Sequence, residues 1–308
     1  MLRFDFASDF SEGLAAVRIG DRYAYIDRTG KEVITIDPSF DGVSAFSEGR
    51  ALVRVNDVCG YIDRTGAVVI PPQFPGANAF ANGLAAVRTG SRYGYINLAG
   101  EMAIEPQFTL NSDFSEGVAA VKLDESYGYI DPQGKWAIEP QFEDAWSFSE
   151  SRAVVRIAGQ PGYIDRTSAI VIPSSFDGAF SFSEGLGRIR KGSIWGFLDV
   201  TGATAIAPKF DFASDFSQGL AAVLVGSQWG YANPQGEIAI APQFSFAADF
   251  ASGLAAVTLN GQIGYIDRTG KIAIKPQFTQ AGSFAGGFAW VKLDSNWHFI
   301  DPEGNFLT

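Results

Sequence analysis

The sequence predicts an all-β protein built as a tandem array of nine three-stranded antiparallel meanders that stack face to face. Three observations predict this fold: a fixed repeat period, three short strand-like segments in each repeat, and apolar residues on both faces of the sheet that those segments would form. Small units of this kind cannot bury their apolar faces alone, so they are stable only when they stack on neighbours.

The repeat period is carried by the phenylalanines. Eighteen of the 26 phenylalanines form nine pairs six residues apart, and after one spacing of 36 residues the pairs recur every 34 residues. The pairs are Phe4/Phe10, Phe40/Phe46, Phe74/Phe80, Phe108/Phe114, Phe142/Phe148, Phe176/Phe182, Phe210/Phe216, Phe244/Phe250 and Phe278/Phe284. We therefore expect one repeat domain, 1–308, with repeats at 4–39, 40–73, 74–107, 108–141, 142–175, 176–209, 210–243, 244–277 and 278–308.

The second repeat shows the three predicted strands at residues 50–55, 58–63 and 67–70. Asn56-Asp57 gives the first two strands the connection length of a tight β-hairpin. Asp63 and Gly66 occupy the favoured first and last positions of a type I turn before the third strand. A proline follows the third strand in most repeats and is expected to end it: Pro72, Pro106, Pro140, Pro208, Pro242 and Pro276.

The predicted register explains why both faces of the sheet are apolar. It sets Gly60 opposite Val53 on one side and Ile70 on the other, and a glycine in the middle strand marks a close approach. The next position faces the other way and is aromatic in every repeat: Tyr25, Tyr61, Tyr95, Tyr129, Tyr163, Phe197, Tyr231, Tyr265 and Phe299. We expect neighbouring repeats to cover both faces and the phenylalanine pairs to bridge them.

Face-to-face stacking allows an open superhelix, that is, a solenoid, or a closed nine-bladed ring resembling a propeller. Propeller blades normally have four strands and about 40–50 residues, whereas these repeats have 34 residues and three clear strands. The chain also begins and ends in phase, which leaves no N-terminal strand to complete the last repeat. We therefore favour the open superhelix. The closed ring is the alternative, and a fourth strand formed by the Phe-x5-Phe segment would favour it.

Composition limits the classes of partner. The net charge of −11 and pI near 4.6 argue against nucleic acid or an anionic membrane surface as the main partner. No apolar run has the length of a membrane span, so no membrane insertion is expected. The N-terminal residues lack the pattern of a signal peptide, so a cytoplasmic protein is expected, although a trimmed chain or a mature secreted form would look the same.

A short motif in the middle strand carries a family resemblance. The sequence reads Trp195-Gly196-Phe197 and Trp229-Gly230-Tyr231, with tyrosine in place of tryptophan in Tyr93-Gly94-Tyr95. With the turn that follows, this pattern resembles the bacterial WG (KWG) repeat family over almost the whole chain. The resemblance implies an all-β module of variable copy number, which suits an open array. It implies no established activity and no catalytic residues.

Two columns of side chains are candidate binding residues. Aromatic residues that could hold a glycan if they were exposed along a groove precede the glycine: Tyr23, Tyr93, Tyr127, Trp195, Trp229 and Trp297. Basic residues that could bind anions end the first strand: Arg18, Arg54, Arg88, Lys122, Arg156, Arg190 and Lys292. The simpler interpretation of the basic column is that each stem covers the aromatic residue opposite, as Arg18 would cover Tyr23. Glutamates in the Ser-Glu-Gly turns are its candidate partners: Glu12, Glu48, Glu116, Glu150 and Glu184.

Three further features have a chemical and a structural interpretation, and we favour the structural one for each. His298, the only histidine, is expected to cap the last repeat. Cys59, the only cysteine, is expected to be a small buried residue. The aspartates of the turns suit the turns themselves, so no metal site or other cofactor is expected; they are Asp27, Asp63, Asn97, Asp131, Asp165, Asp199, Asn233, Asp267 and Asp301.

These features favour a non-catalytic binding scaffold over an enzyme. The hairpin tip between the first two strands varies most between repeats, and varied tips on a constant frame form a recognition surface. A protein partner is the leading hypothesis, and a carbohydrate such as a cell-wall glycan is the second. A hydrolase built around His298 and a purely structural spacer are the remaining alternatives.

Overall fold

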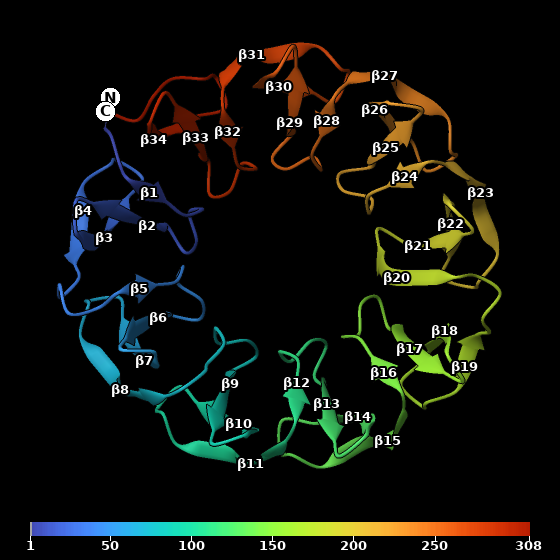
Figure 1. Cartoon of the computed structure of the whole chain (residues 1–308), viewed down its shortest axis with the longest axis horizontal. Helices are drawn as coiled ribbons and strands as arrows, with labels where there is room; N and C mark the ends of the chain where they lie inside the picture. Colours follow the sequence, from blue (N-terminus) through green and yellow to red (C-terminus); the bar gives the residue numbers. More distant parts are fainter. Residues whose placement is uncertain (1) are drawn as a thin grey trace. The chain divides into compact units, whose positions relative to one another are not determined.

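The computed structural model describes residues 2–308, which contain 34 β-strands and no helix (Figure 1). The strands form nine small antiparallel sheets, and within each sheet the strands lie side by side in chain order. Seven sheets have four strands and two have three. All nine predicted repeats are therefore present, and we number the sheets blade 1 to blade 9.

The strands occupy four successive places in the blades. The first strands are β1 (Phe6–Ala7), β5 (Gly42–Val43), β12 (Leu110–Asn111), β16 (Asp144–Ala145), β20 (Gly178–Ser183), β24 (Phe212–Ala213), β28 (Phe246–Ala247) and β32 (Gln280–Ala281). The second strands are β2 (Leu14–Ile19), β6 (Arg50–Val55), β9 (Leu84–Thr89), β13 (Ala119–Leu123), β17 (Ala153–Ile157), β21 (Leu186–Lys191), β25 (Ala221–Val225), β29 (Leu254–Leu259) and β33 (Ala289–Leu293).

The third strands are β3 (Arg22–Asp27), β7 (Val58–Asp63), β10 (Arg92–Asn97), β14 (Ser126–Ile130), β18 (Gln160–Ile164), β22 (Ile194–Asp199), β26 (Gln228–Ala232), β30 (Gln262–Asp267) and β34 (Asn296–Ile300). The fourth strands are β4 (Glu32–Thr35), β8 (Val68–Phe74), β11 (Met102–Phe108), β15 (Trp136–Phe142), β19 (Ile170–Ile172), β23 (Thr204–Phe210), β27 (Ile238–Phe244) and β31 (Ile272–Phe278).

The expectation of three strands per repeat is wrong for most blades, because the Phe-x5-Phe segment supplies an additional first strand. In blade 1 this strand pairs Phe6 with Arg18 and Ala7 with Val17. It has only two residues in most blades, which is too short to show the alternation by which strands are recognised in a sequence.

The predicted pairing of the second and third strands is confirmed, whereas that of the third and fourth strands is wrong by one residue. In blade 4 the hairpin sets Val121 opposite Gly128 as expected. The fourth strand bulges, so that Tyr129 rather than the glycine lies opposite Ile138. A Cβ atom on Gly128 would lie 2.6 Å from the carbonyl oxygen of Ile138. The glycine recurs because the bulged backbone crosses over it, and not because two aliphatic side chains close over it.

The prolines do not end the strands that precede them, contrary to expectation. Pro140, for example, lies inside β15. The fourth strand is the edge of its sheet, so the missing N–H of proline removes no hydrogen bond from the ladder. This fourth strand, which the sequence predicted as the third strand of the repeat, is consequently longer than its sequence pattern indicates.

The aromatic residue that follows the glycine of most third strands, such as Tyr129, forms the core between blades. Tyr129 is fully buried, and its ring lies 4.9 Å from that of Phe148 in the next blade. The same contact recurs at 4.8–5.0 Å in the pairs Tyr25–Phe46, Tyr61–Phe80, Tyr95–Phe114, Tyr163–Phe182, Tyr231–Phe250 and Tyr265–Phe284. The second phenylalanine of each pair thus joins two blades, as the sequence predicts.

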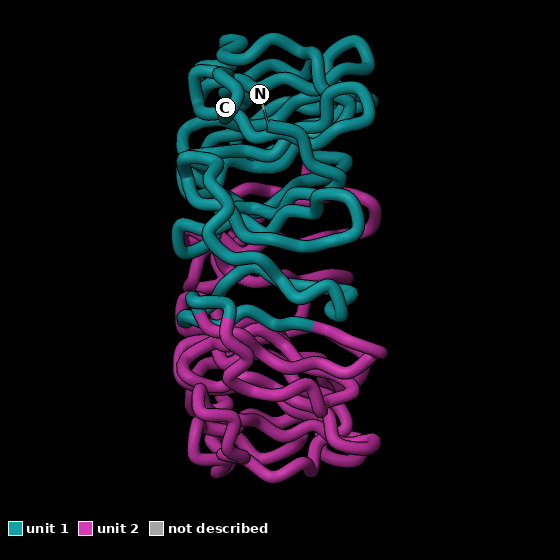
Figure 2. The backbone as a smooth tube through the Cα atoms, turned by 90° about the vertical axis from the view of Figure 1, so that its left-hand side faces the viewer, with its two compact units in different colours: residues 1–53, 64–66, 210–308 teal, residues 54–63, 67–209 magenta. Residues whose placement is uncertain are grey.

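The chain divides into two compact units, coloured separately in Figure 2. Unit 1 comprises Met1–Val53, Arg64–Gly66 and Phe210–Thr308, and unit 2 comprises Arg54–Asp63 and Ala67–Lys209. Unit 1 therefore contains both ends of the chain.

Within unit 1, the two ends of the chain together complete the last blade. Phe4 exchanges two backbone hydrogen bonds with Trp297 in β34, at 3.0 and 2.9 Å, and the N–H of Leu2 donates to the carbonyl of Leu307 at 3.1 Å. Phe306 pairs with Ile300 of the same strand. These contacts correspond to those of a whole fourth strand such as β15, in which Trp136 pairs with Ile130 and Phe142 with Tyr127.

The favoured open superhelix is therefore wrong, and the fold is a nine-bladed β-propeller. Figure 1 shows the two termini side by side, with β34 and β1 next to each other. The ring of Phe299 in blade 9 lies 4.9 Å from Phe10 and 5.9 Å from Phe4 of blade 1. The sequence argument failed because residues 2–4, assigned to no strand, supply the missing end of the last blade.

We expect truncation of a bridging phenylalanine to destabilise the protein strongly. Phe80 and Phe114 are 1% and 4% exposed, so Phe80→Ala and Phe114→Ala should each lower the free energy of unfolding by about 3–5 kcal/mol. Urea denaturation followed by tryptophan fluorescence measures this loss. Phe6→Ala, at a ring that is 39% exposed, is the control and should cost much less. A loss under about 1 kcal/mol at Phe114 would contradict its role between blades.

Removal of residues 1–4 should loosen blade 9 specifically. The deletion takes away both hydrogen bonds to Trp297 and the buried ring of Phe4, a loss of about 3–5 kcal/mol for the ring alone. Hydrogen–deuterium exchange should become faster in β34 and remain unchanged in β14 of unit 2. Equal protection of β34 with and without these residues would show that the N-terminus does not complete the blade.

Candidate functional site

Antiparallel strands place the connections of each blade at two opposite ends. The turns between the first and second strands and between the third and fourth strands lie at one end, which we call the turn end. The hairpins between the second and third strands, and the links to the next blade, lie at the other end, which we call the tip end. The candidate residues separate clearly between these two ends.

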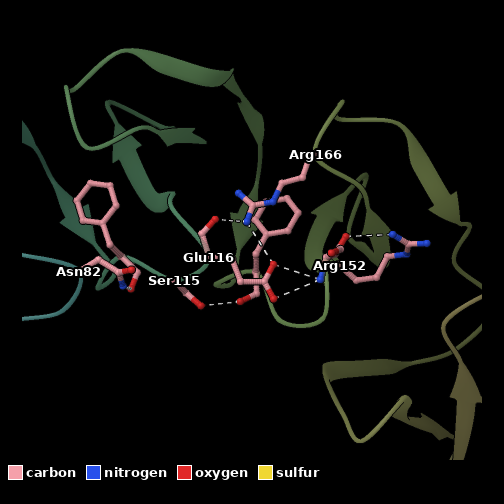
Figure 3. A network of polar contacts seen from close by, with 8 residues as sticks. Asn82, Ser115, Glu116, Arg152 and Arg166 are labelled. Atoms are coloured by element: carbon pink, nitrogen blue, oxygen red, sulfur yellow. Dashed lines mark hydrogen bonds and ion pairs between the residues drawn. The ribbon is translucent and has the colours of Figure 1, made fainter.

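At the turn end, polar side chains join several blades to the next, as Figure 3 shows around Glu116. The carboxylate of Glu116 in blade 4 accepts a hydrogen bond from the N–H of Ser151 in blade 5 and lies 3.2 Å from the guanidinium of Arg166. The hydroxyl of Ser115 donates to the carbonyl of Phe148 at 2.8 Å. Arg166 also donates to the carbonyl of Glu116 and covers the ring of Phe148.

The same contacts recur between other blades. Glu12 accepts from the N–H of Gly49 and pairs with Arg64, and Glu150 accepts from the N–H of Gly185. The predicted partnership between the turn glutamates and the basic column is therefore wrong for Glu12, Glu116 and Glu150. Their carboxylates are held at the turn end, whereas the basic column ends the second strand at the tip end.

The joint between blades 9 and 1 lacks the side chains for these polar contacts. Ala285, Gly286 and Phe299 stand where other repeats have the serine, the glutamate and the tyrosine. A Cβ atom on Gly286 would lie 2.9 Å from the Cβ of Phe10, so blade 1 leaves no room for a side chain there. Burial raises the pKa of Asp9 at this joint, and a hydrogen bond from Trp290 partly opposes that increase.

The turn aspartates use their carboxylates within their own turns. The Oδ1 atom of Asp27 accepts hydrogen bonds from the N–H and the hydroxyl of Thr29, at 2.8 and 2.6 Å, and from the N–H of Lys31. The bond from Thr29 holds the pKa of Asp27 below its usual range. Within residues 2–308, no group of three or more histidine, cysteine, aspartate or glutamate side chains is arranged to hold a metal ion.

His298 is buried at the join between the two ends of the chain. It is 3% exposed, and its Nδ1 atom lies 2.6 Å from the carbonyl oxygen of Leu2. In most other blades the fourth strand crosses close over this position, which is glycine, and in blade 1 it is the small residue Ala24. In blade 9 the fourth strand is interrupted between Thr308 and Leu2, so the imidazole fits, which agrees with the expected capping role. Cys59 is buried in β7, also as expected.

At the tip end, the basic and aromatic columns lie opposite each other across the second and third strands. Arg18 pairs with Tyr23, and Lys122 pairs with Tyr127. The ammonium of Lys122 lies 5.5 Å from the centre of the Tyr127 ring, so the charged group itself, which was expected in solvent or beside a carboxylate, contacts the aromatic residue. The same pairing joins Arg88 with Tyr93, Arg190 with Trp195, and Lys292 with Trp297.

The aromatic column does not form a continuous exposed groove. Trp195 is buried, at 9% exposure, and Trp229 is half-buried between Phe212 and Phe246, whose rings lie 5.6 and 6.0 Å away. The basic column is also engaged in part, since Arg156 donates to the carbonyl of Gly159 and Arg190 to that of Gly192.

Two pockets at the tip end were not predicted from the sequence. One, of about 540 Å³, lies between blades 1 and 2 and is lined by Asp5, Arg18, Asp21, Tyr23 and Asp41, among other residues. The second, of about 330 Å³, lies between blades 7 and 8. A third, apolar pocket of about 180 Å³ adjoins Gly162 in blade 5, where β19 ends early.

Exposed apolar residues on the first strands, or directly after them as for Trp146, are a further feature that sequence reasoning missed. In unit 1 they are Phe6, Phe212 and Phe246, and in unit 2 they are Leu110, Trp146 and Phe180; they are 36–51% exposed, and we call each set the first-strand row of its unit. Most other repeats have a small or polar residue at the corresponding positions, such as Gly42 and Gly76, or Ser44 and Ser112. That departure from the repeat pattern is the sequence signal that could have identified them.

The comparison with protein families agrees with the geometry of the repeats. The family described as "WG containing repeat" matches nine segments, at residues 2–23, 23–59, 60–93, 93–126, 127–160, 162–193, 195–228, 229–262 and 263–297. The chain belongs to this WG-repeat family. No curated protein matches its sequence.

One solved structure shares the fold of this WG-repeat protein, and two others have lower similarity. A eukaryotic initiation factor is similar with a TM-score of 0.64 and 11% identity, over 87% of this chain and 86% of that chain. Hsv2 of Kluyveromyces lactis has a TM-score of 0.44 and 7% identity, over 76% and 94%. The extracellular domain of a hybrid two component system from B. thetaiotaomicron has a TM-score of 0.36 and 10% identity, over 98% and 52%.

We expect the buried tyrosines of the WG repeats to make the protein sensitive to alkali. Burial raises the pKa of Tyr129, whose hydroxyl donates to the carbonyl of Trp146 at 2.8 Å. The folded protein holds this proton more tightly than the unfolded chain, in which tyrosine titrates near pH 10. The stabilisation is therefore present below about pH 10 and is lost as the pH rises further. The same applies to Tyr25, Tyr61, Tyr95, Tyr231 and Tyr265.

Urea midpoints measured across this pH range test the effect. Tyr129→Phe should cost about 1 kcal/mol at neutral pH through the lost hydrogen bond and should reduce the dependence on alkali. Phenylalanine already fills this place as Phe197 and Phe299, so the fold tolerates it. Stability that stayed level well above pH 10 would contradict the expectation.

Proposed function

We propose that this WG-repeat protein is a non-catalytic scaffold that binds a protein partner through the first-strand row of unit 2. That row consists of Leu110, Trp146 and Phe180, in three successive blades. The observation that carries the proposal is the indole of Trp146, which is 40% exposed on a repeat whose other aromatic rings are largely buried. Contiguous exposed apolar patches mark interaction sites, and we infer that these three residues of successive blades contribute to one.

Trp146 and Phe180 replace residues that serve the fold. In blade 4 the corresponding residue is Ser112, whose hydroxyl accepts a hydrogen bond from the N–H of Ala120 at 2.9 Å. The same contact is made by Ser8, Ser44 and Ser214. Tryptophan and phenylalanine give up this bond and leave much of an apolar ring in water. Both costs fall on the free protein, so a bound partner that covers the rings is the simplest source of compensation.

An arginine is added to the same region of blade 6. Arg188 occupies a position that is alanine in many repeats, as in Ala86 and Ala120. Its guanidinium lies 4.3 Å from the ring of Phe180 and 5.0 Å from that of Trp195. Tryptophan and arginine are the residue types most enriched at the energetic centres of protein interfaces, which supports a protein as the partner.

The polar residues support a non-catalytic role. The turn carboxylates hold their own turns or the next blade, and the imidazole of His298 lies on the backbone of Leu2. The net charge of −11 favours a partner with a neutral or basic surface over nucleic acid.

Restoring the repeat residue provides a clean test. The double variant Trp146→Ser, Phe180→Ser should fold normally, because serine is the residue of other repeats at this position, and it should lose the partner that the wild type captures from a lysate of the native host. Val68→Ser with Met102→Ser is the control, since these residues are 46% and 36% exposed on fourth strands of the same unit. Quantitative mass spectrometry compares the captured proteins. Capture of the same partner by wild type and by the double variant would refute the proposed surface.

A further inference from the structure

We propose that the pocket between blades 7 and 8 binds a neutral sugar. All residues of the pocket belong to compact unit 1, and none belongs to the protein-binding row of unit 2. Its volume of about 330 Å³ is in the range of small-ligand sites. Six of its seven lining residues are neutral and polar: Ser227, Gln228, Gln243, Ser245, Thr258 and Asn260. The seventh is Leu259.

The absence of charge in this pocket is a local departure from the repeat pattern. Thr258 replaces a residue of the basic column, as does Leu224 in the preceding blade. Ser227 and Ser245 stand at the repeat positions of Asp21 and Asp41, which line the charged pocket between blades 1 and 2. A charged ligand would lose hydration here without meeting an opposite charge, whereas a neutral polar ligand would not incur that cost.

The carboxamides are available for a ligand. Within residues 2–308, the side chains of Gln228, Gln243 and Asn260 form no hydrogen bond with another residue, whereas the hydroxyl of Ser245 donates to the carbonyl of Thr258 at 3.3 Å. Each carboxamide offers a donor group and an acceptor, and each hydroxyl offers both. The hydroxyls of a sugar also donate and accept, so neighbouring hydroxyls on one ring complement a carboxamide.

An exposed aromatic ring lies beside this polar surface. Phe246 follows Ser245 in the chain and is paired with Thr258, so two residues of the pocket flank it. It is 51% exposed, and Trp229 supports it with ring centroids 6.0 Å apart. An aromatic ring next to several neutral hydrogen-bonding groups suits the two kinds of surface of a sugar, because its C–H face is apolar and its rim is polar.

These features favour a sugar over a peptide. A peptide is normally anchored by a large side chain in an apolar pocket, and Leu259 is the only apolar residue of this lining. A peptide that binds through the same residues is therefore the competing outcome of the experiment.

Titration calorimetry with defined oligosaccharides tests the proposal. The neutral probes are the hexasaccharides of glucose in α-1,4 and β-1,4 linkage, of mannose, and of N-acetylglucosamine; trigalacturonate is the acidic probe and hexaglycine the peptide probe. We expect at least one neutral hexasaccharide to bind, trigalacturonate and hexaglycine not to bind, and Gln243→Ala and Asn260→Ala each to weaken the affinity roughly tenfold.

Gln107→Ala is the matched control, because Gln107 has the same repeat position as Gln243 in another blade. It should leave sugar binding unchanged, and thermal denaturation should show that all three variants are folded. The proposal is overturned if no neutral hexasaccharide binds at millimolar concentration, if Gln243→Ala and Asn260→Ala bind as the wild type does, or if hexaglycine binds instead. Loss of the protein partner through Trp146 and Phe180 is measured separately, so either proposal can fail alone.

Discussion

The arrangement of most blades depends on the contact between a buried tyrosine of one blade and a phenylalanine of the next. Seven such pairs have ring centroids 4.8–5.0 Å apart. In each, the tyrosine hydroxyl also reaches a backbone carbonyl of the next blade, as Tyr129 reaches Trp146. The ring contributes burial and edge-to-face packing, and the hydroxyl fixes the position of the neighbouring first strand. One side chain thus provides both the stability and the alignment of a joint, and this repetition leaves the tip end free to vary.

The repeat number, the second and third strands and the bridging phenylalanines could be predicted from the sequence, because each rests on a pattern repeated nine times. The first strands could not, since a pair such as Phe6–Ala7 is too short to show a period. The closure was missed for a related reason: Leu2 and Phe4 are a fragment of a strand whose other part, around Phe306, is about 300 residues away. The bulge opposite Gly128 involves backbone only and leaves a trace in the sequence solely as the glycine itself.

The candidate sites were less predictable than the fold because they lie where the repeats differ. The columns identified from the sequence are the recurrent positions, and recurrence selects for residues that hold the blades together, as the contact of Lys122 with Tyr127 illustrates. Trp146, Phe180, Thr258 and Ser245 are departures from the pattern, and they line the surfaces to which we assign binding. In a repeat protein of this kind, functional residues are better sought among the exceptions to the repeat than among its shared positions.

The strand that is shared between the two termini also constrains how the gene can change in length. Most internal repeats supply both an aromatic residue and a phenylalanine to their joints, so duplication or loss of one such repeat leaves the remaining joints with similar aromatic partners. Blades 1 and 9 are different, because Leu2 and Phe4 fit only beside His298 and Trp297. A change in repeat number is therefore expected to be tolerated in the interior of the chain, whereas a change at one end of the chain calls for a matching change at the other.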